Sequence, residues 1–108
     1  MDQPLRVLLL EDNPDDAQLV ERELIKSGFS LVTKRVETRE EFLSALSEFN
    51  PDILIADFSL PQFDALSALR LLKVNDSDLP VILVTGSQSE EMAAACIKAG
   101  AFDYILKS

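Results

Sequence analysis

The sequence contains no histidine, and this absence removes several common mechanisms. Nucleophilic mechanisms of the Ser-His-Asp and Cys-His types need an imidazole as base, and the usual zinc sites need it as a ligand. There is only one cysteine, Cys96, so no internal disulfide can form. Because Cys96 lies in the apolar run 93–97, we interpret it as a small buried helical residue rather than a reactive thiol.

Long apolar runs and basic residues are also scarce. No apolar stretch approaches the roughly 20 residues of a membrane span. Residues 1–4 lead through one short apolar run into an acidic motif, without the charged start and cleavage site of a signal peptide. We therefore expect a cytoplasmic protein that does not bind membranes. With 19 acidic and 10 basic residues the net charge is −9, so we expect no direct contact with nucleic acid.

The length and apolar content of the chain suit one compact domain. Its 108 residues, of which 47% are apolar, are enough to form a single hydrophobic core. Short apolar runs alternate strictly with helical patterns. The strands are expected at residues 6–10, 31–36, 53–56, 81–84 and 102–106. Helical crossovers between such strands imply an α/β fold with a parallel sheet covered on both faces.

Capping signals mark the helices. Asn13 and Pro14 suit the cap and first position of a helix that ends at Gly28, and Thr38 with Glu41 forms a capping box. Two further helices are expected from about residue 64 and over residues 87–100. Each helix is expected to turn an apolar face toward the sheet. These faces are formed by Ala17, Val20 and Leu24 on the first helix, by Phe42, Leu46 and Phe49 on the second, and by Leu66, Leu69 and Leu72 on the third.

Polar residues follow four of the five predicted strands. Glu11 and Asp12 follow the first strand, Asp57 the third, Thr85 the fourth and Lys107 the fifth. Parallel sheets bind ligands beyond the carboxyl ends of their strands, so these side chains should meet at one rim. Each residue alone has an ordinary interpretation as a cap, a turn residue or a surface lysine. Only their shared placement favours a site.

Three converging carboxylates repel one another and call for a cation. Mg²⁺ fits best, because it takes one or two carboxylates together with waters and a phosphate oxygen. We expect Asp12 and Asp57 as direct ligands, the backbone carbonyl of Ser59 as a third, and Glu11 acting through a water. Lys107 and Thr85 could then surround the oxygens of a phosphoryl group.

Asp57 would be the nucleophile in such a site. Aspartate forms acyl phosphates that water later removes, so the chain would catalyse its own phosphorylation and slow dephosphorylation rather than act as a conventional enzyme.

These motifs together resemble the receiver domains of bacterial two-component response regulators, from residue 7 to residue 107. The likeness rests on four features: Glu11-Asp12 after an apolar strand, Asp57 followed by Leu60-Pro61, Thr85-Gly86 closing the fourth strand, and Tyr104 three residues before Lys107. It implies a flavodoxin-like doubly wound sheet of five strands in the order 2-1-3-4-5, with the final helix absent from this chain.

The resemblance also implies a role for each matching residue. The implied roles are phosphoacceptor for Asp57, Mg²⁺ binding for Glu11 and Asp12, contact with the phosphoryl group for Thr85 and Lys107, and aromatic switch for Tyr104. The phosphoryl group would come from a histidine kinase or a histidine phosphotransfer protein.

A downstream output domain or effector would read the phosphorylated state, and we expect residues 1–108 to be the N-terminal part of a longer signalling protein. Without the final helix, apolar residues such as Val7, Leu9 and Ile105 should lie partly exposed, which favours a covering partner, for instance a second copy in a homodimer. The Lys107–Ser108 peptide bond is predicted to be trans, since no proline follows.

Two other functions compete with the phosphoacceptor switch. One is an interaction module of the same fold that is not phosphorylated, from which Mg²⁺ binding would distinguish the switch. The other is a Mg²⁺-dependent phosphohydrolase, but such enzymes usually place a second acid two residues after the nucleophile, where Ser59 stands. A flavodoxin is disfavoured because residues 11–14 are acidic rather than a phosphate cradle.

Overall fold

The computed structural model describes residues 3–57, 63, 65–85, 94–95, 97–98, 100–101 and 103–106, with the backbone alone at 85 and 103–106. The elements are β1 (Leu5–Leu10), α1 (Pro14–Lys26), β2 (Leu31–Val36), α2 (Arg39–Glu48), β3 (Ile53–Asp57), α3 (Ala65–Val74), β4 (Val81–Thr85) and β5 (Asp103–Leu106). Each predicted strand is found within one residue of its expected bounds. In the described part of the chain no helix is long and apolar enough to cross a bilayer.

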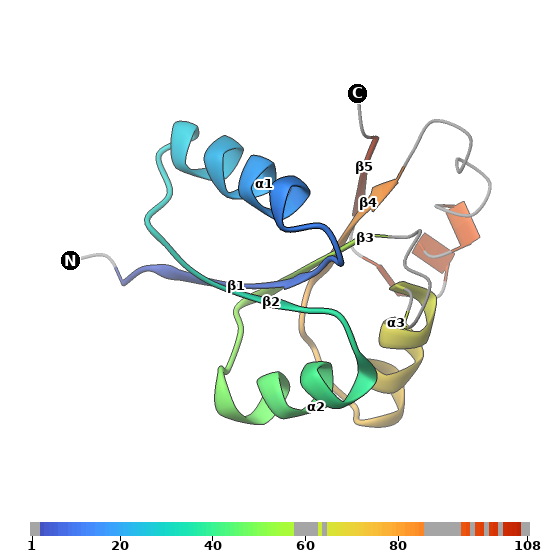
Figure 1. The fold of residues 1–108 in the computed structure, drawn as a ribbon. Helices are drawn as coiled ribbons and strands as arrows, with labels where there is room; N and C mark the ends of the chain where they lie inside the picture. Colours follow the sequence, from blue (N-terminus) through green and yellow to red (C-terminus); the bar gives the residue numbers. More distant parts are fainter. Residues whose placement is uncertain are drawn as a thin grey trace.

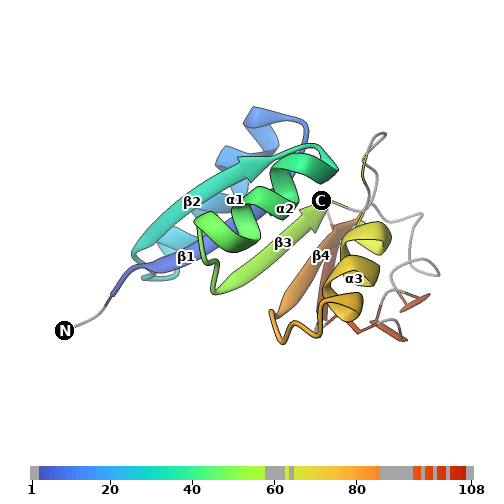
Figure 2. The same cartoon turned by 90° about the horizontal axis from the view of Figure 1, so that it is seen from below.

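The five strands form one sheet in the order β2-β1-β3-β4-β5, and every neighbouring pair is parallel. Helix α1 covers one face, and α2 and α3 cover the other (Figure 1). Figure 2 shows α2 and α3 lying over the sheet on their shared face. The expected flavodoxin-like fold and strand order are therefore confirmed.

The core lies mainly between the sheet and the α2–α3 face. Phe42 of α2 is fully buried, and its ring lies 5.3 Å from that of Phe63, with an interplanar angle of 46°. The predicted apolar faces of the three helices are confirmed. Ala17, Phe42, Leu69 and Leu72 are buried, and Val20, Leu24, Leu46, Phe49 and Leu66 pack against the core while partly exposed.

On the α1 face, the prediction that Val7 and Leu9 lie partly exposed is wrong. These residues are 0% and 2% exposed, because β1 is an interior strand and α1 packs directly over it. Strand β4 contributes the partly exposed apolar residues Ile82 and Val84 to this face. Among the described residues, partly exposed apolar side chains of this face thus lie on β4, between the two strands expected to carry them. The side chain of Ile105 lies outside the described residues.

The helix ends follow the local signals. Asn13 Oδ1 accepts the N–H of Asp15 at 2.9 Å, with Pro14 at the first helical position. Gly28, two residues after α1, has a φ of 96°, a left-handed conformation that glycine adopts without strain. The capping box of Thr38 and Glu41 is present at the start of α2.

Some expectations fall on parts of the chain that the structure does not describe. Residues 94–95 and 97–98 are helical, as expected within the predicted helix over 87–100, but its start lies outside the described residues. The Lys107–Ser108 peptide bond also lies outside them.

Candidate functional site

The sheet register brings the ends of β1 and β3 together. Leu10 of β1 pairs with Ala56 of β3, so Glu11 and Asp57 occupy the next positions on two neighbouring strands. The N–H of Glu11 continues the ladder on the other side, donating to the carbonyl of Val36 at 3.1 Å. The chain thus leaves β1 with its first acidic residue still held in the sheet.

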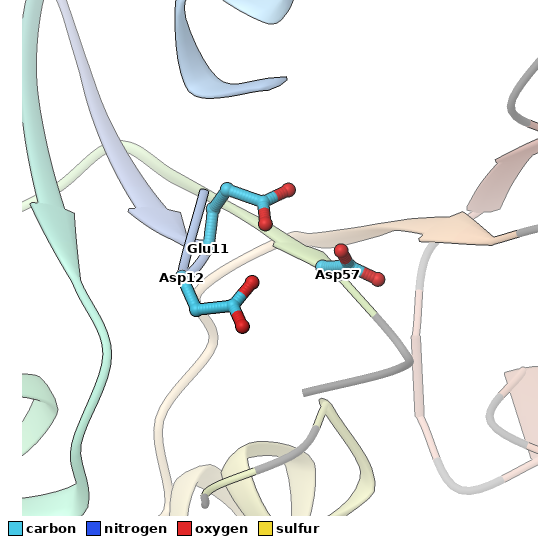
Figure 3. Close-up of side chains that lie close together, drawn as sticks. All are labelled: Glu11, Asp12 and Asp57. Carbon is cyan, nitrogen blue, oxygen red and sulfur yellow. The ribbon is translucent and has the colours of Figure 1, made fainter. Parts of the chain in front are cut away.

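Three carboxylates gather at this edge. One oxygen from each of Glu11, Asp12 and Asp57 can be chosen so that all three lie within 4.8 Å of one another. Figure 3 shows Glu11 and Asp12 at the end of β1, with Asp57 beside them at the end of β3. Glu11 and Asp57 are each only 6% exposed, whereas Asp12 is exposed. Mutual repulsion and partial burial make this arrangement favourable only if cationic or hydrogen-bonding groups compensate the charge.

The donor set suits Mg²⁺. Mg²⁺ is a hard cation that takes oxygen ligands, carboxylates among them, and Glu11, Asp12 and Asp57 would hold it with oxygens that lie within 4.8 Å of one another. Because Asp12 is exposed, the remaining coordination positions can be filled by water or by a phosphate oxygen.

The backbone around the acidic pair is also braced. A carboxylate oxygen of Glu11 accepts the N–H of Asn13 at 3.1 Å, and Asn13 in turn caps α1. The acidic residues Asp15 and Asp16 occupy the first turn of that helix, where they complement its positive end. The loop between β1 and α1 is therefore held at both ends.

Of the other predicted site residues, two have a described backbone. Thr85 ends β4, one position beyond Val84, which pairs with Asp57. Tyr104 of β5 pairs with Leu83, two residues before Thr85. Lys107, Ser59 and Gly86 lie outside the described residues.

Among the described residues, Arg35 also contacts this site, although the sequence did not single it out. The guanidinium Nη1 of Arg35, on β2, donates to the backbone carbonyl of Glu11 at 3.2 Å and to Glu37 Oε1 at 2.7 Å. A signal was available, because strand order 2-1-3 places the end of the second strand beside the end of the first. A basic residue near that end can therefore reach the acidic loop.

A model of the response regulator receiver domain matches residues 7–108. PrrA, a transcriptional regulatory protein of Mycobacterium tuberculosis, is 35% identical over 102 residues, which are 94% of this chain and 43% of PrrA. The DNA-binding transcriptional regulator NtrC of Klebsiella pneumoniae is 33% identical over 99 residues, 92% of this chain and 21% of NtrC. The chain thus spans less than half the length of these curated relatives.

Solved structures agree with these matches. The receiver domain of the Francisella response regulator 1452 superimposes with a TM-score of 0.79 at 27% identity, covering 97% of this chain and 84% of that one. NtrX from Brucella abortus has a TM-score of 0.83 at 27% identity, covering 97% of this chain and 23% of NtrX. With its parallel sheet and its acidic cluster, the chain belongs to the receiver domain family of two-component response regulators.

Proposed function

We propose that this domain is a phosphorylation-dependent switch in which Asp57 accepts a phosphoryl group at a Mg²⁺ site. Glu11, Asp12, Asp57 and the carbonyl of Ser59 would hold the ion, with Glu11 acting through a water. The observation that carries the proposal is the approach of three carboxylates to within 4.8 Å at the carboxyl edge of the sheet. Bound Mg²⁺ would neutralise their charge and that of the incoming phosphoryl oxygens.

In the transfer step, a carboxylate oxygen of Asp57 attacks the phosphorus of a phosphohistidine. An O–P bond forms and the P–N bond breaks, and its electron pair stays on the imidazole nitrogen, which leaves the histidine neutral after proton exchange with water. Lys107 and Thr85 would contact the transferring oxygens. Water later attacks the phosphorus, releasing inorganic phosphate and restoring the carboxylate.

The position of Asp57 supports this role. Its side chain is 6% exposed, and it ends β3, a strand paired on both sides. A nucleophile held by a central strand has a defined direction of attack, and in a partly desolvated site each electrostatic contact is stronger than in water.

The phosphorylated state would be transmitted through the neighbouring strands. The Thr85 hydroxyl would move toward the phosphoryl group, and the ring of Tyr104 would turn inward into the space it leaves. The register of β4 and β5 supports this coupling, since Tyr104 pairs with a residue two positions before Thr85.

The proposed partners follow from this chemistry. A histidine kinase or histidine phosphotransfer protein supplies the phosphoryl group, and an output domain or effector reads the result, with residues 1–108 acting as the receiver part of a longer signalling protein. A second copy of the chain is also a proposed partner. The partly exposed Ile82 and Val84 support it, and light scattering at increasing protein concentration tests it.

Phosphorylation with a small phosphodonor and Mg²⁺ tests the central proposal. The parent should gain one base-labile phosphoryl group that mass spectrometry maps to Asp57, and Asp57→Asn should gain none. Asp78→Asn is the matched control, because Asp78 is an exposed acid in the turn before β4, at the opposite edge of the sheet. A phosphoryl group on any other residue would overturn the assignment, as would an unchanged Mg²⁺ affinity in Asp57→Asn.

A further inference from the structure

The hydrogen-bond ladder between β1 and β2 stops at Glu11. The Glu11 N–H donates to the carbonyl of Val36, which is the regular parallel pattern. In that pattern the next bond would run from the N–H of Thr38 to the Glu11 carbonyl. Thr38 instead donates its N–H to Glu41 Oε1 at 3.2 Å, as part of the α2 cap. The Thr38 N–H therefore serves the α2 cap rather than the ladder.

Arg35 donates a hydrogen bond to the Glu11 carbonyl from its side chain. Its Nη1 lies 3.2 Å from the Glu11 carbonyl oxygen. The same atom lies 2.7 Å from Glu37 Oε1, and Glu37 in turn donates its N–H to Glu41 Oε1 at 2.8 Å. The Arg35 side chain is 35% exposed, so most of its surface is covered by the rest of the protein. A continuous set of hydrogen bonds thus joins the start of α2 to the end of β1.

The bonded carbonyl belongs to the peptide that joins Glu11 to Asp12. A hydrogen bond that restrains the plane of this peptide restrains the ψ angle of Glu11 and the φ angle of Asp12, and with them the directions in which the two side chains leave the backbone. We infer that Arg35 is a positioning residue for the Mg²⁺ site: through the Glu11 carbonyl it holds Glu11 and Asp12 in the orientation that meets Asp57. This inference rests on the proposed function.

The positive charge of Arg35 should lower the affinity for Mg²⁺, whereas its hydrogen bond to the Glu11 carbonyl should raise that affinity. A nearby cation reduces the negative potential that attracts Mg²⁺, so if charge alone mattered, removing Arg35 would tighten binding. If positioning dominates, removing Arg35 weakens binding, since outer partners of metal ligands typically contribute 10- to 100-fold in affinity. The sign of the change therefore separates the two effects.

The test is a titration of metal-free protein with Mg²⁺ alone, followed by the NMR signals of the Glu11 and Asp12 amides. Arg35→Met keeps the aliphatic stem and removes every donor, and we expect binding about 10-fold weaker. Arg35→Lys keeps a charged donor of nearly the same reach and should recover most of that loss. Lys34→Met removes one positive charge from the adjacent exposed position on β2 and should not weaken binding.

A second readout needs no metal. The Asp12 amide nitrogen belongs to the peptide whose carbonyl Arg35 contacts, so its chemical shift should already move in metal-free Arg35→Met and return toward the parent value in Arg35→Lys. Glu37→Gln provides an independent variant, because it weakens one of the two contacts that hold the guanidinium. If Arg35→Met does not fold, the metal-free Asp12 amide shift of Glu37→Gln decides: a shift away from the parent value, as expected on loosening the guanidinium, supports the positioning role, and an unchanged shift overturns it.

The outcomes separate this inference from the proposed function. A parent protein that binds no Mg²⁺ would contradict the proposed site itself. A parent that binds, with Arg35→Met binding equally or more tightly, would overturn the positioning role and leave the site standing. Weaker binding in Arg35→Met that Arg35→Lys does not recover would also overturn it.

Discussion

At the scale of single residues, the acidic cluster shows function competing with stability. Two of its carboxylates, Glu11 and Asp57, are nearly buried, and all three members place an oxygen within 4.8 Å of the others. At such separations, repulsion between like charges amounts to about 3 kcal/mol for an effective dielectric constant of about 20. A metal-free receiver should therefore carry a local electrostatic cost that ligand binding relieves.

The first prediction follows from that repulsion. Without metal, Asp57→Asn should raise the free energy of unfolding by on the order of 1 to 3 kcal/mol, because one of three repelling charges is removed. Urea unfolding in the presence of a chelator measures the change. Adding Mg²⁺ should stabilise the parent and leave Asp57→Asn nearly unaffected. A variant less stable than the parent without metal would show that other contacts of Asp57 outweigh the repulsion.

The second prediction concerns Thr85 and Tyr104. Fluoroberyllate bound at Asp57 imitates the phosphoryl group, so we expect NMR signals of both residues to shift on its addition. Thr85→Ala should uncouple them, leaving the Tyr104 ring signals close to those of the unmodified protein. Unchanged signals at both residues in the parent would contradict the coupling.

At the scale of elements, the start of α2 serves two purposes. The Glu41 carboxylate accepts the N–H groups of Glu37 and Thr38, and Thr38 Oγ1 accepts the N–H of Glu41 at 3.2 Å. These bonds cap the helix, and they also occupy the donor that would otherwise have bonded Glu11. The cap and the Arg35 contact with the Glu11 carbonyl therefore meet at the end of β1.

The third prediction tests the cap. Thr38→Ala should lower the free energy of unfolding by about 1 kcal/mol, because it leaves a helix N–H without its side-chain acceptor. Denaturant unfolding measures this, with Thr38→Ser as the control, since serine keeps the hydroxyl and should lose far less. A loss of the same size in Thr38→Ser would point to the lost methyl group rather than the cap.

The fourth prediction concerns pH. The N–H of Glu37, and then that of Thr38, hold the pKa of Glu41 below the ordinary glutamate value. A lowered folded-state pKa contributes stability above the unfolded pKa of about 4.3, and this contribution is lost as pH falls through the folded value. The Glu37 and Thr38 amide signals should therefore titrate together with the Glu41 carboxyl, at a pH below the ordinary value. Titration at or above that value would contradict the cap geometry.

At the scale of the whole molecule, the sheet divides the core into two unequal parts. The larger lies under α2 and α3, where Phe42 meets Phe63, and the smaller lies under α1. Because the larger part joins both helices to the sheet, its loss should unfold the domain as a unit.

The fifth prediction follows from this core. Phe42→Ala should cost about 3 to 5 kcal/mol, a large share of the roughly 5 to 15 kcal/mol that stabilises a domain. Leu43→Ala is the matched control on the same helix, since Leu43 is 36% exposed and should cost much less. Thermal unfolding of the two variants gives the comparison, and equal losses would contradict the position of the core.

Much of this protein could be predicted from its sequence, because the signals are local. The five short apolar runs, the caps at Asn13 and Thr38 and the left-handed Gly28 depend on neighbouring residues alone, and the structure places them as expected. The meeting of Glu11, Asp12 and Asp57 also followed, because strand order and parallel direction determine which strand ends are neighbours.

Only the tertiary structure decided the rest, because it depends on which surfaces meet. Val7 and Leu9 are buried since α1 packs directly over β1, a placement that no local pattern in the sequence specifies. The Arg35 side chain contacts the Glu11 carbonyl at the point where the regular ladder would place the Thr38 N–H, which the α2 cap uses instead. Strand composition and caps are short-range properties of the chain, whereas burial and a side-chain hydrogen bond from β2 to the end of β1 arise only when distant segments pack together.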